Sequence, residues 1–472
     1  MSTLAILGIS LVVFGQPAAP QSAAAAATVL TINDAARLAA DQNRTLLEAQ
    51  EAVAAAQAAL RQAKSQEGYT LSASAGVTRL GPVAVVTLPL GNGQSETFQL
   101  TPPIEWNAQL TLLQPITRGG AFYWQEVLAQ QGIDVATYQR DATRLLVTSS
   151  ARQLFLQVIQ AQQLEQVAAE NVSRAATHLQ DARARVDAGT APGYDAIRAE
   201  ADVENANNGL VAAHAAVDQT LAVLKTLLTI DQMKPLRLDS PKTQGQFLID
   251  VADAIRASGM HRPEVQAVDT AFHLAETRVR LADTAKKPDI NAVATYARQA
   301  ASSFGGTAEA WTIGLQYTQL IFDHGLTRHT VEQAQANARS AEQSAKATRE
   351  QIAQQVYQAW ISLREAAEQI VDAEKGAAAA EEAMRIADLS YREGVSTPVQ
   401  VTDARTALIS AHANLVNARF GYELARVALE AATGVTIADL ASGAWARPVK
   451  LPGPTMAATK PASAAVAKAP AK

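Results

Sequence analysis

The 472-residue sequence contains no cysteine. This absence excludes disulfides, Cys-ligated zinc or iron–sulfur centres, thiol catalysis and a lipidated N-terminal cysteine. An excess of positive charge is also lacking, since 40 Lys and Arg residues stand against 45 Asp and Glu residues. The sequence therefore provides no broad basic face for nucleic acid, and we expect no nucleic-acid partner.

Beyond the N-terminus there is no uncharged apolar stretch of 18 residues, so we expect no transmembrane helix. Residues 4–14 form a shorter apolar run, followed by two prolines and an alanine tract. This pattern predicts a signal peptide over residues 1–27. No Lys or Arg precedes the run, so the signal is atypical or its start is truncated. A disordered apolar leader is the alternative.

The rest of the chain is an internal duplication. The stretch from Leu113 to Gly120 matches that from Thr318 to Gly325, and Gly189 matches Gly394, both at an offset of 205 residues. Upstream the offset is 218 to 219, so the first copy carries about 14 extra residues, rich in Gly and Pro. We predict one duplicated unit with a lengthened loop in its first copy.

Each copy reads as helix, strand, strand, helix, helix, with repeats over 28–230 and 249–435. Residues 231–248 are expected to be a linker in an equatorial segment, and 436–472 an equatorial and disordered tail. Asn33 or Asp34 is the predicted N-cap of an alanine-rich helix that reaches about Gln66. The proline-free run over 121–188 predicts a helix roughly 100 Å long. Its alanines favour close lateral packing.

Strands are predicted over 69–79, 105–115, 288–298 and 309–319, because apolar and polar residues alternate there. About ten residues is the length of a tilted strand that crosses an outer membrane. The polar faces are uncharged over most of their length, which suits a wet lumen. A soluble two-sheet domain also fits the alternation. Four strands cannot close a barrel, whereas a trimer would provide twelve. The apolar faces carry aromatics that would form a membrane girdle, namely Trp106, Tyr296, Trp311 and Tyr317.

The duplicated unit, the opening "LTINDAARLAADQN", the strand ends "LLQPITRGG" and "TQLIFDHG", and the two glycine-centred turns resemble the outer membrane efflux proteins of the TolC type. The resemblance covers about residues 30–435. It implies a mainly α fold with a membrane β-barrel portion: a homotrimer with a twelve-stranded barrel in the lipid of a Gram-negative outer membrane, continued by a long α-helical barrel. It also implies a passive exit duct for efflux or type I secretion, with a periplasmic adaptor and an inner-membrane pump as partners.

The resemblance places both glycine-centred turns at the periplasmic tips, where the adaptor docks and the tube narrows to a gate. The adaptor-contacting positions correspond to Arg185, Ala188, Gly189, Thr190, Gly394 and Val395, with Tyr391 beside them at the aperture. Family members carry acids six and nine residues after the second glycine. These positions are Gln400 and Asp403 here, so one acidic ring is kept and one is neutral.

In the best-known members an acid of the first tip, here Asp195, bonds an arginine of the second tip. That position is Ser396 in this sequence, with Arg392, Arg405 and Arg198 as possible substitutes. Asp403 itself can be interpreted as a helix cap or dipole complement. In a trimer, three such carboxylates on one axis would instead form a cation-selective constriction.

Competing interpretations are weaker. Asp323, His324 and His329 lie within seven residues, but the histidine spacing is not that of a helical zinc pair, and a polar turn is favoured. We expect no metal, no cofactor and no enzymatic activity. A periplasmic adaptor or a structural coiled-coil protein of the envelope remain alternatives. Both predict a chain without two pairs of amphipathic strands.

Overall fold

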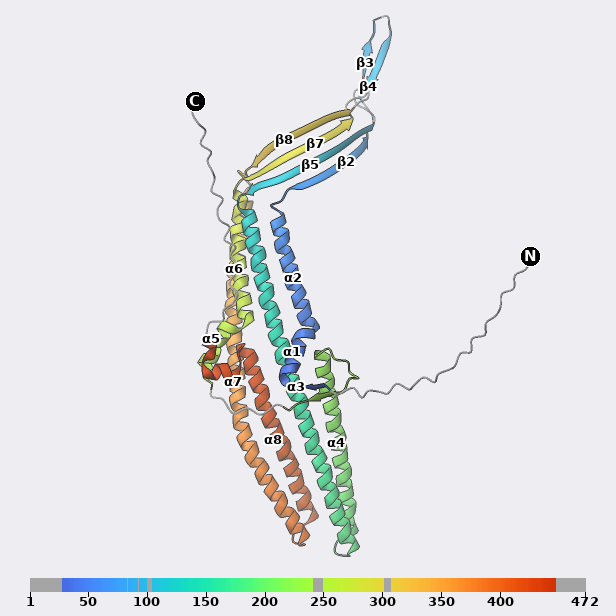
Figure 1. The fold of residues 1–472 in the computed structure, drawn as a ribbon, viewed down its shortest axis with the longest axis vertical. Coiled ribbons are helices and arrows are strands. Elements are labelled where there is room, and N and C mark those ends of the chain that lie inside the picture. The colour runs from blue at the N-terminus through green and yellow to red at the C-terminus, as the bar shows by residue number, and fades with distance from the viewer. Residues whose placement is uncertain are drawn as a thin grey trace, which may run out of the picture.

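The computed structural model describes residues 28–82, 84–91, 93–99, 104–240, 249–300 and 307–446. The molecule is elongated, with a sheet at one end, two long helical hairpins at the other and a belt of short elements between them (Figure 1). The predicted signal peptide, residues 241–248 of the predicted linker and residues 447–472 of the predicted tail lie outside the described residues.

The predicted duplication is confirmed, with the first helix of each unit divided in two. The first copy contains α1 (Ile32–Gln42), α2 (Arg44–Ser65), β2 (Thr70–Arg79), β5 (Ile104–Arg118), α3 (Ala121–Asp187) and α4 (Gly193–Leu227). The second copy contains α5 (Val251–His261), α6 (Pro263–Asp283), β7 (Asp289–Ala300), β8 (Thr307–Thr318), α7 (Leu326–Arg392) and α8 (Pro398–Thr433). The four strand ranges lie within three residues of the predicted ones. Both α3 and α7 have 67 residues, a length of roughly 100 Å.

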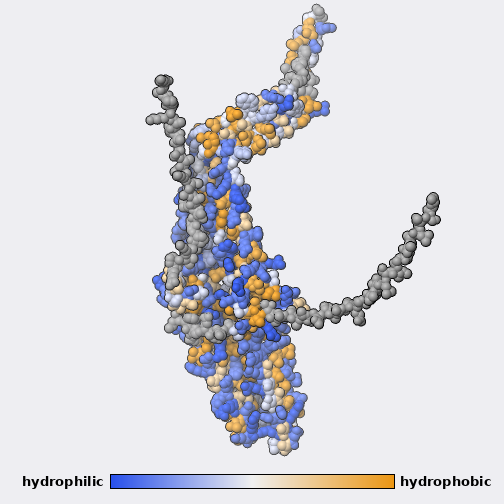
Figure 2. All heavy atoms as spheres, viewed as in Figure 1, coloured by the Kyte–Doolittle hydropathy of each residue, from blue (hydrophilic) through white to orange (hydrophobic). Residues whose placement is uncertain are grey.

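The sheet has the strand order β2-β5-β7-β8, is antiparallel throughout and is open, with β2 and β8 at its edges. The register gathers the apolar positions of all four strands on one face, including Leu71, Val77, Leu110, Leu112, Ile313 and Leu315. Uncharged polar residues line up on the other face, for example Ser72, Thr111, Thr295 and Thr312. Figure 2 shows apolar side chains over the sheet and a mostly hydrophilic surface over the hairpins.

The extra residues of the first copy form a β-hairpin of β3 (Val85–Pro89) and β4 (Ser95–Gln99), which extends beyond the sheet (Figure 1). The lengthened loop that we predicted is therefore partly a regular structure. Gly91 and Gly93 provide the left-handed backbone of its turn, with φ values of +54° and +78°.

The prediction of one helix from Asn33 or Asp34 to Gln66 was wrong in two respects. Thr31 is the N-cap, because its hydroxyl and the Asp34 carboxylate form a capping box. The helix also breaks at Asn43, which caps α2 and donates from Nδ2 to the carbonyl of Leu227 at 3.2 Å. The second copy repeats this joint, since Arg262 donates to the carbonyls of Ala431 and Ala432 at 3.0 and 3.1 Å.

Each joint places the start of an upper helix (α2 or α6) beside the end of a lower helix (α4 or α8). Around the joints lies the belt, built from a parallel pair of β1 (Thr28–Leu30) and β6 (Leu236–Leu238), α1, α5 and α9 (Ile437–Ser442). Short 3-10 turns η1 (Thr284–Lys286) and η2 (Ala444–Ala446) complete the described elements. Apolar clusters from α1, α3 and α4, and from α5, α7, α8 and α9, fill the belt.

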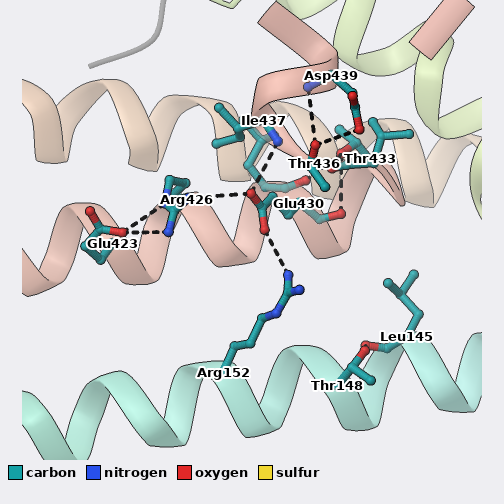
Figure 3. A network of polar contacts seen from close by, with 12 residues as sticks. Leu145, Thr148, Arg152, Glu423, Arg426, Glu430, Thr433, Thr436, Ile437 and Asp439 are labelled. Atoms are coloured by element: carbon teal, nitrogen blue, oxygen red, sulfur yellow. Dashed lines mark hydrogen bonds and ion pairs between the residues drawn. The ribbon is translucent and has the colours of Figure 1, made fainter. Parts of the chain in front are cut away.

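An ionic network joins the two copies at the belt (Figure 3). Arg152 of α3 donates to Glu430 of α8 at 3.2 Å, and the same carboxylate accepts from the backbone N–H of Ile437 at 3.3 Å. Arg426 approaches Glu430 at 3.7 Å and pairs with Glu423 at 2.9 Å. A single carboxylate therefore contacts the first copy, the second copy and the start of α9.

Gly434 provides a test of the joint in the second copy. Its φ is +76°, and a Cβ there would lie 3.1 Å from the carbonyl oxygen of His261. We expect Gly434→Ala to lower the free energy of unfolding by roughly 1–3 kcal/mol, since strain in the left-handed region adds to crowding. The measurement is denaturant unfolding in detergent, followed by helical circular dichroism. Gly376→Ala is the control, because Gly376 lies in α7 with open space around it and should lose no stability. Equal effects would contradict the strain at Gly434.

Candidate functional site at the hairpin tips

The two hairpin tips have the same backbone design. Gly189 and Gly394 adopt φ values of +72° and +78°, just after the ends of α3 and α7. The next residue closes each turn, with Thr190 N donating to Arg185 O and Val395 N to Ser390 O, both at 2.9 Å. Glycine is favoured here because the left-handed conformation clashes with a Cβ. Both tips lie at the end of the molecule opposite the sheet (Figure 1).

The two predicted gate positions on α8 differ in what they contact. Gln400 accepts a hydrogen bond from the backbone N–H of Thr397 at 3.0 Å, within a capping box at the start of the helix. Asp403 lies one turn further on, is exposed, and has no hydrogen bond or ion pair with any described residue. The helix is therefore capped by Thr397 and Gln400, and the interpretation of Asp403 as a cap is wrong.

Tyr391 lies in the contact between the two hairpins near their tips, a second joint distinct from those at the belt, rather than on an open surface. It is 3% exposed and packs with Met384, Val401 and Leu408. Arg185 of the first hairpin lies 4.2 Å from its ring centroid and donates to the carbonyls of Tyr391 and Arg392. Burial raises the pKa of the Tyr391 hydroxyl. The arginine therefore attaches the end of α3 to the end of α7 by a cation–π contact and two hydrogen bonds.

Among the described residues, Asp195 forms no hydrogen bond or ion pair with Ser396 or with the three candidate arginines. Instead Arg405 pairs with Asp202 of α4 at 2.9 Å, and Thr402 donates to the same carboxylate at 3.2 Å. The side chains of Arg405 and Asp202 are 7% and 19% exposed. Arg392 approaches Asp181 at 3.8 Å. The first-copy acid with the more buried contact between the hairpins is therefore Asp202, which the sequence did not indicate because no turn or repeat marks it.

His178 of α3 completes the joint. It is 8% exposed, and its ring centroid lies 5.2 Å from that of Tyr391. Burial lowers the pKa of His178, and the nearby Arg405 lowers it further, while Asp202, Asp388 and Asp181 oppose the change. His178 is therefore held in the neutral form by its surroundings when the hairpins are packed.

The remaining predicted residues are distributed as follows. Ala188, Gly189, Thr190, Gly394 and Val395 lie in the two turns, and Val395 is 80% exposed. The four aromatics lie on the apolar face of the sheet, with Tyr296 directly opposite Trp311. Asp323 caps the start of α7 by accepting from Gly325 and Thr327, which lowers its pKa through the Thr327 bonds above all. His329 pairs with Glu332, so this segment is a polar turn between strand and helix.

Among the described residues, no group of three or more His, Asp or Glu side chains lies together as metal ligands would. None of the helices in the described part has the length and hydropathy needed to cross a membrane.

The model of the family described as "Outer membrane efflux protein" matches residues 35–229 and 255–435. The chain belongs to the outer membrane efflux protein family. Among curated relatives, the outer membrane efflux protein BepC of Brucella suis is 25% identical over 288 residues, which is 60% of this chain and 62% of BepC.

Solved members of the family share the fold. The CmeC outer membrane channel of Campylobacter jejuni superposes with a TM-score of 0.71 at 20% identity, over 85% of each chain. The outer membrane protein VceC of Vibrio cholerae gives 0.70 at 18% identity, over 86% of this chain and 96% of VceC. The predicted fold class is thereby confirmed, with the sheet of the single chain left open. Adaptor and coiled-coil interpretations are not supported.

The Asp202–Arg405 pair gives a first test of the joint. We expect Asp202→Ala to weaken the packing of the hairpins by about 3 kcal/mol, because it leaves a buried guanidinium without its carboxylate. Amide hydrogen exchange in the tip halves of α4 and α8 should accelerate by about 100-fold. Glu200→Ala is the control on the same helix, since its pair with Arg183 is exposed and contributes roughly 0–1 kcal/mol at most. Equal acceleration by both variants would contradict the role of Asp202.

The lowered pKa of His178 predicts a pH dependence. His178 binds a proton less readily when the two hairpins are packed than when they are separated, because its pKa lies near the ordinary value of 6.5 in the separated state. Well above pH 6.5, His178 is neutral in both states and does not change the free energy of hairpin packing. As pH falls through and below that value, the free energy of packing becomes less favourable. Exchange at the tips, corrected for intrinsic rates, should rise relative to pH 7.5 at pH 5.5 and rise less in His178→Phe. His273→Gln, at an exposed histidine of α6 remote from the tips, should retain the wild-type dependence.

Proposed function

We propose that the chain forms the exit duct of an efflux or type I secretion machinery in the outer membrane of a Gram-negative bacterium. The observation that supports this most is the open sheet, with one apolar face and one polar face that is uncharged over most of its length, connected to helices roughly 100 Å long. The apolar face, with its aromatic girdle, suits outer membrane lipid, and the polar face suits a water-filled lumen.

A homotrimer completes the duct. A lipid-exposed strand edge would leave backbone N–H and C=O groups unpaired, and three copies of four strands remove every edge. The helices continue the tube toward an inner-membrane pump. Transport through such a duct is passive, so the chain needs no catalytic residue, metal or cofactor.

The hairpin tips are the docking site for a periplasmic adaptor. Besides Val395, the tips expose Ile197 at 68% and Tyr194 at 65%, which a helical hairpin of the partner would cover. Arg185, Ala188, Gly189, Thr190 and Gly394 provide the turn backbone and its support. A trimer in the outer membrane fraction, with the mass of three chains, is the expected result of fractionation and native mass measurement. A soluble monomer would overturn the proposal.

The gate is closed by one acidic ring at Asp403, which is free for this role because Gln400 and Thr397 cap the helix. We expect Asp403→Asn to reduce the cation selectivity of the channel in planar bilayers severalfold, because three carboxylates no longer attract cations to the axis. Asp372→Asn is the control, at an exposed acid in the middle of α7 that should leave selectivity unchanged. Unchanged cation preference in Asp403→Asn would exclude the ring.

A further inference from the structure

A pocket of about 410 Å³ lies in the belt between the two copies, beside the ionic network. It is lined by α1 and α3 of the first copy, and by the end of α8 and the link that follows it. Figure 3 includes part of it, with Thr148 and Arg152 on α3 and Glu430 and Thr436 on the opposite side. Small-molecule sites have volumes of about 300–1,000 Å³, so the pocket is large enough for a small ligand.

The charged residues of the lining are mostly cationic. They are Arg37 of α1, Arg144 and Arg152 of α3, and Glu430 of α8, which gives three positive charges and one negative. Arg37 also pairs with Asp34, which lies outside the lining. The carboxylate of Glu430 already accepts from Arg152 at 3.2 Å. The positive charge that is left over belongs to Arg144, and it favours an anion in the pocket.

Arg144 has a paired counterpart in the second copy. Shifted by 205 residues it becomes Arg349 of α7, which binds Asp269 of α6 at 2.6 Å. Because α2 begins 219 residues before α6, the first-copy position of Asp269 is Gln50. Among the described residues, the Arg144 guanidinium has no hydrogen bond or ion pair, and the residue is exposed. The first copy therefore has the arginine without its acid, and this charge is available to a ligand.

Arg152 is a second cation with unused donors. Its Nη1 donates to Glu430, whereas its Nε is buried and lacks a hydrogen-bond partner among the described residues. Arg144 and Arg152 are eight residues apart on α3, a rise of about 12 Å, and both belong to the lining. Guanidinium groups bind carboxylate and phosphate groups through charge-assisted hydrogen bonds. An anionic group between the two arginines is attracted by both.

The lining also provides apolar surface. Six of its uncharged residues are apolar, namely Ala36, Ala40, Leu145, Val427, Ala431 and Val435. Three of these belong to α8 and the link after it, whereas the arginines belong to α1 and α3. We propose that the pocket binds a small organic anion, whose carboxylate or phosphate group contacts Arg144 and Arg152 and whose apolar part contacts α8. One bound molecule then joins the two copies at the belt.

Calorimetric titration of the full-length protein in detergent tests the site. Phenyl phosphate and benzoate are the probes, because they share an aromatic ring and differ in the anionic group. At least one of them should bind once per chain, and the tighter one identifies the preferred group. Arg144→Gln should weaken this binding about tenfold or more, because it removes a charge-assisted contact to the anion. Failure of both probes to bind the unmodified protein would overturn the site.

The matched control is Arg349→Gln, which makes the same change at the counterpart on α7 and should leave the affinity unchanged. Benzyl alcohol, a neutral molecule with the same ring, should not bind. Inorganic phosphate should bind at least about tenfold more weakly than the tighter probe, because it leaves the apolar surface uncovered. Equal losses in both arginine variants would overturn the location. Binding of benzyl alcohol as tight as that of the probes would overturn the anionic group, and equally tight inorganic phosphate would overturn the apolar part.

Discussion

The main physical constraint on this structure is the row of unpaired backbone N–H and C=O groups at each open edge of the sheet. Water can satisfy such groups on a soluble protein, but the hydrocarbon core of a membrane cannot, and each unsatisfied group there costs several kcal/mol. A chain with four strands and an apolar face therefore has no stable place in a bilayer alone. The open edges at β2 and β8 and the exposed apolar residues 320–322 belong to one incomplete surface.

The belt is where the shorter helices meet end to end. Helices α3 and α7 run from the sheet to the tips without a break, whereas α2 and α4, and α6 and α8, cover the same distance in pairs. In each copy the start of the upper helix lies against the end of the lower helix. The side chains that bind the two ends differ between the copies. Asn43 occupies the position that Arg262 has in the second copy, and both reach the last carbonyls of the lower helix. Thr229, at φ +56°, occupies the position in the first copy that Gly434 has in the second, and its hydroxyl donates to Gln42 O at 3.3 Å. The geometry is retained because the helix ends must meet, whichever side chains bind them.

Repetition and periodicity explain how much of this fold could be predicted. The offset of 205 residues located the tips and strands, since glycines with left-handed backbones and alternating faces leave a local signal. The break at Asn43 was missed because its cause is a distant carbonyl, on Leu227. Asp202 was missed for a similar reason. Its importance comes from Arg405, 203 residues away, and its counterpart in the second copy, Ala407, carries no charge. Gln400 was placed at the gate by resemblance, whereas its side chain is used locally in a cap.

The tips depart from the regularity of the sheet. Between the two hairpins of one chain, Arg405 meets Asp202 and Arg185 meets the end of α7. Shifted by 205 residues, the first pair becomes Glu200 and Ala407, and Arg185 becomes Ser390. A boundary between protomers that repeats the internal junction therefore lacks both attachments. In the proposed trimer, backbone hydrogen bonds would allow the barrel nearly sixfold regularity. The tips would have only threefold regularity, because side chains there hold the two hairpins of one chain together as a unit. In the proposed trimer, the Asp403 carboxylates would lie on three such units, one on each chain.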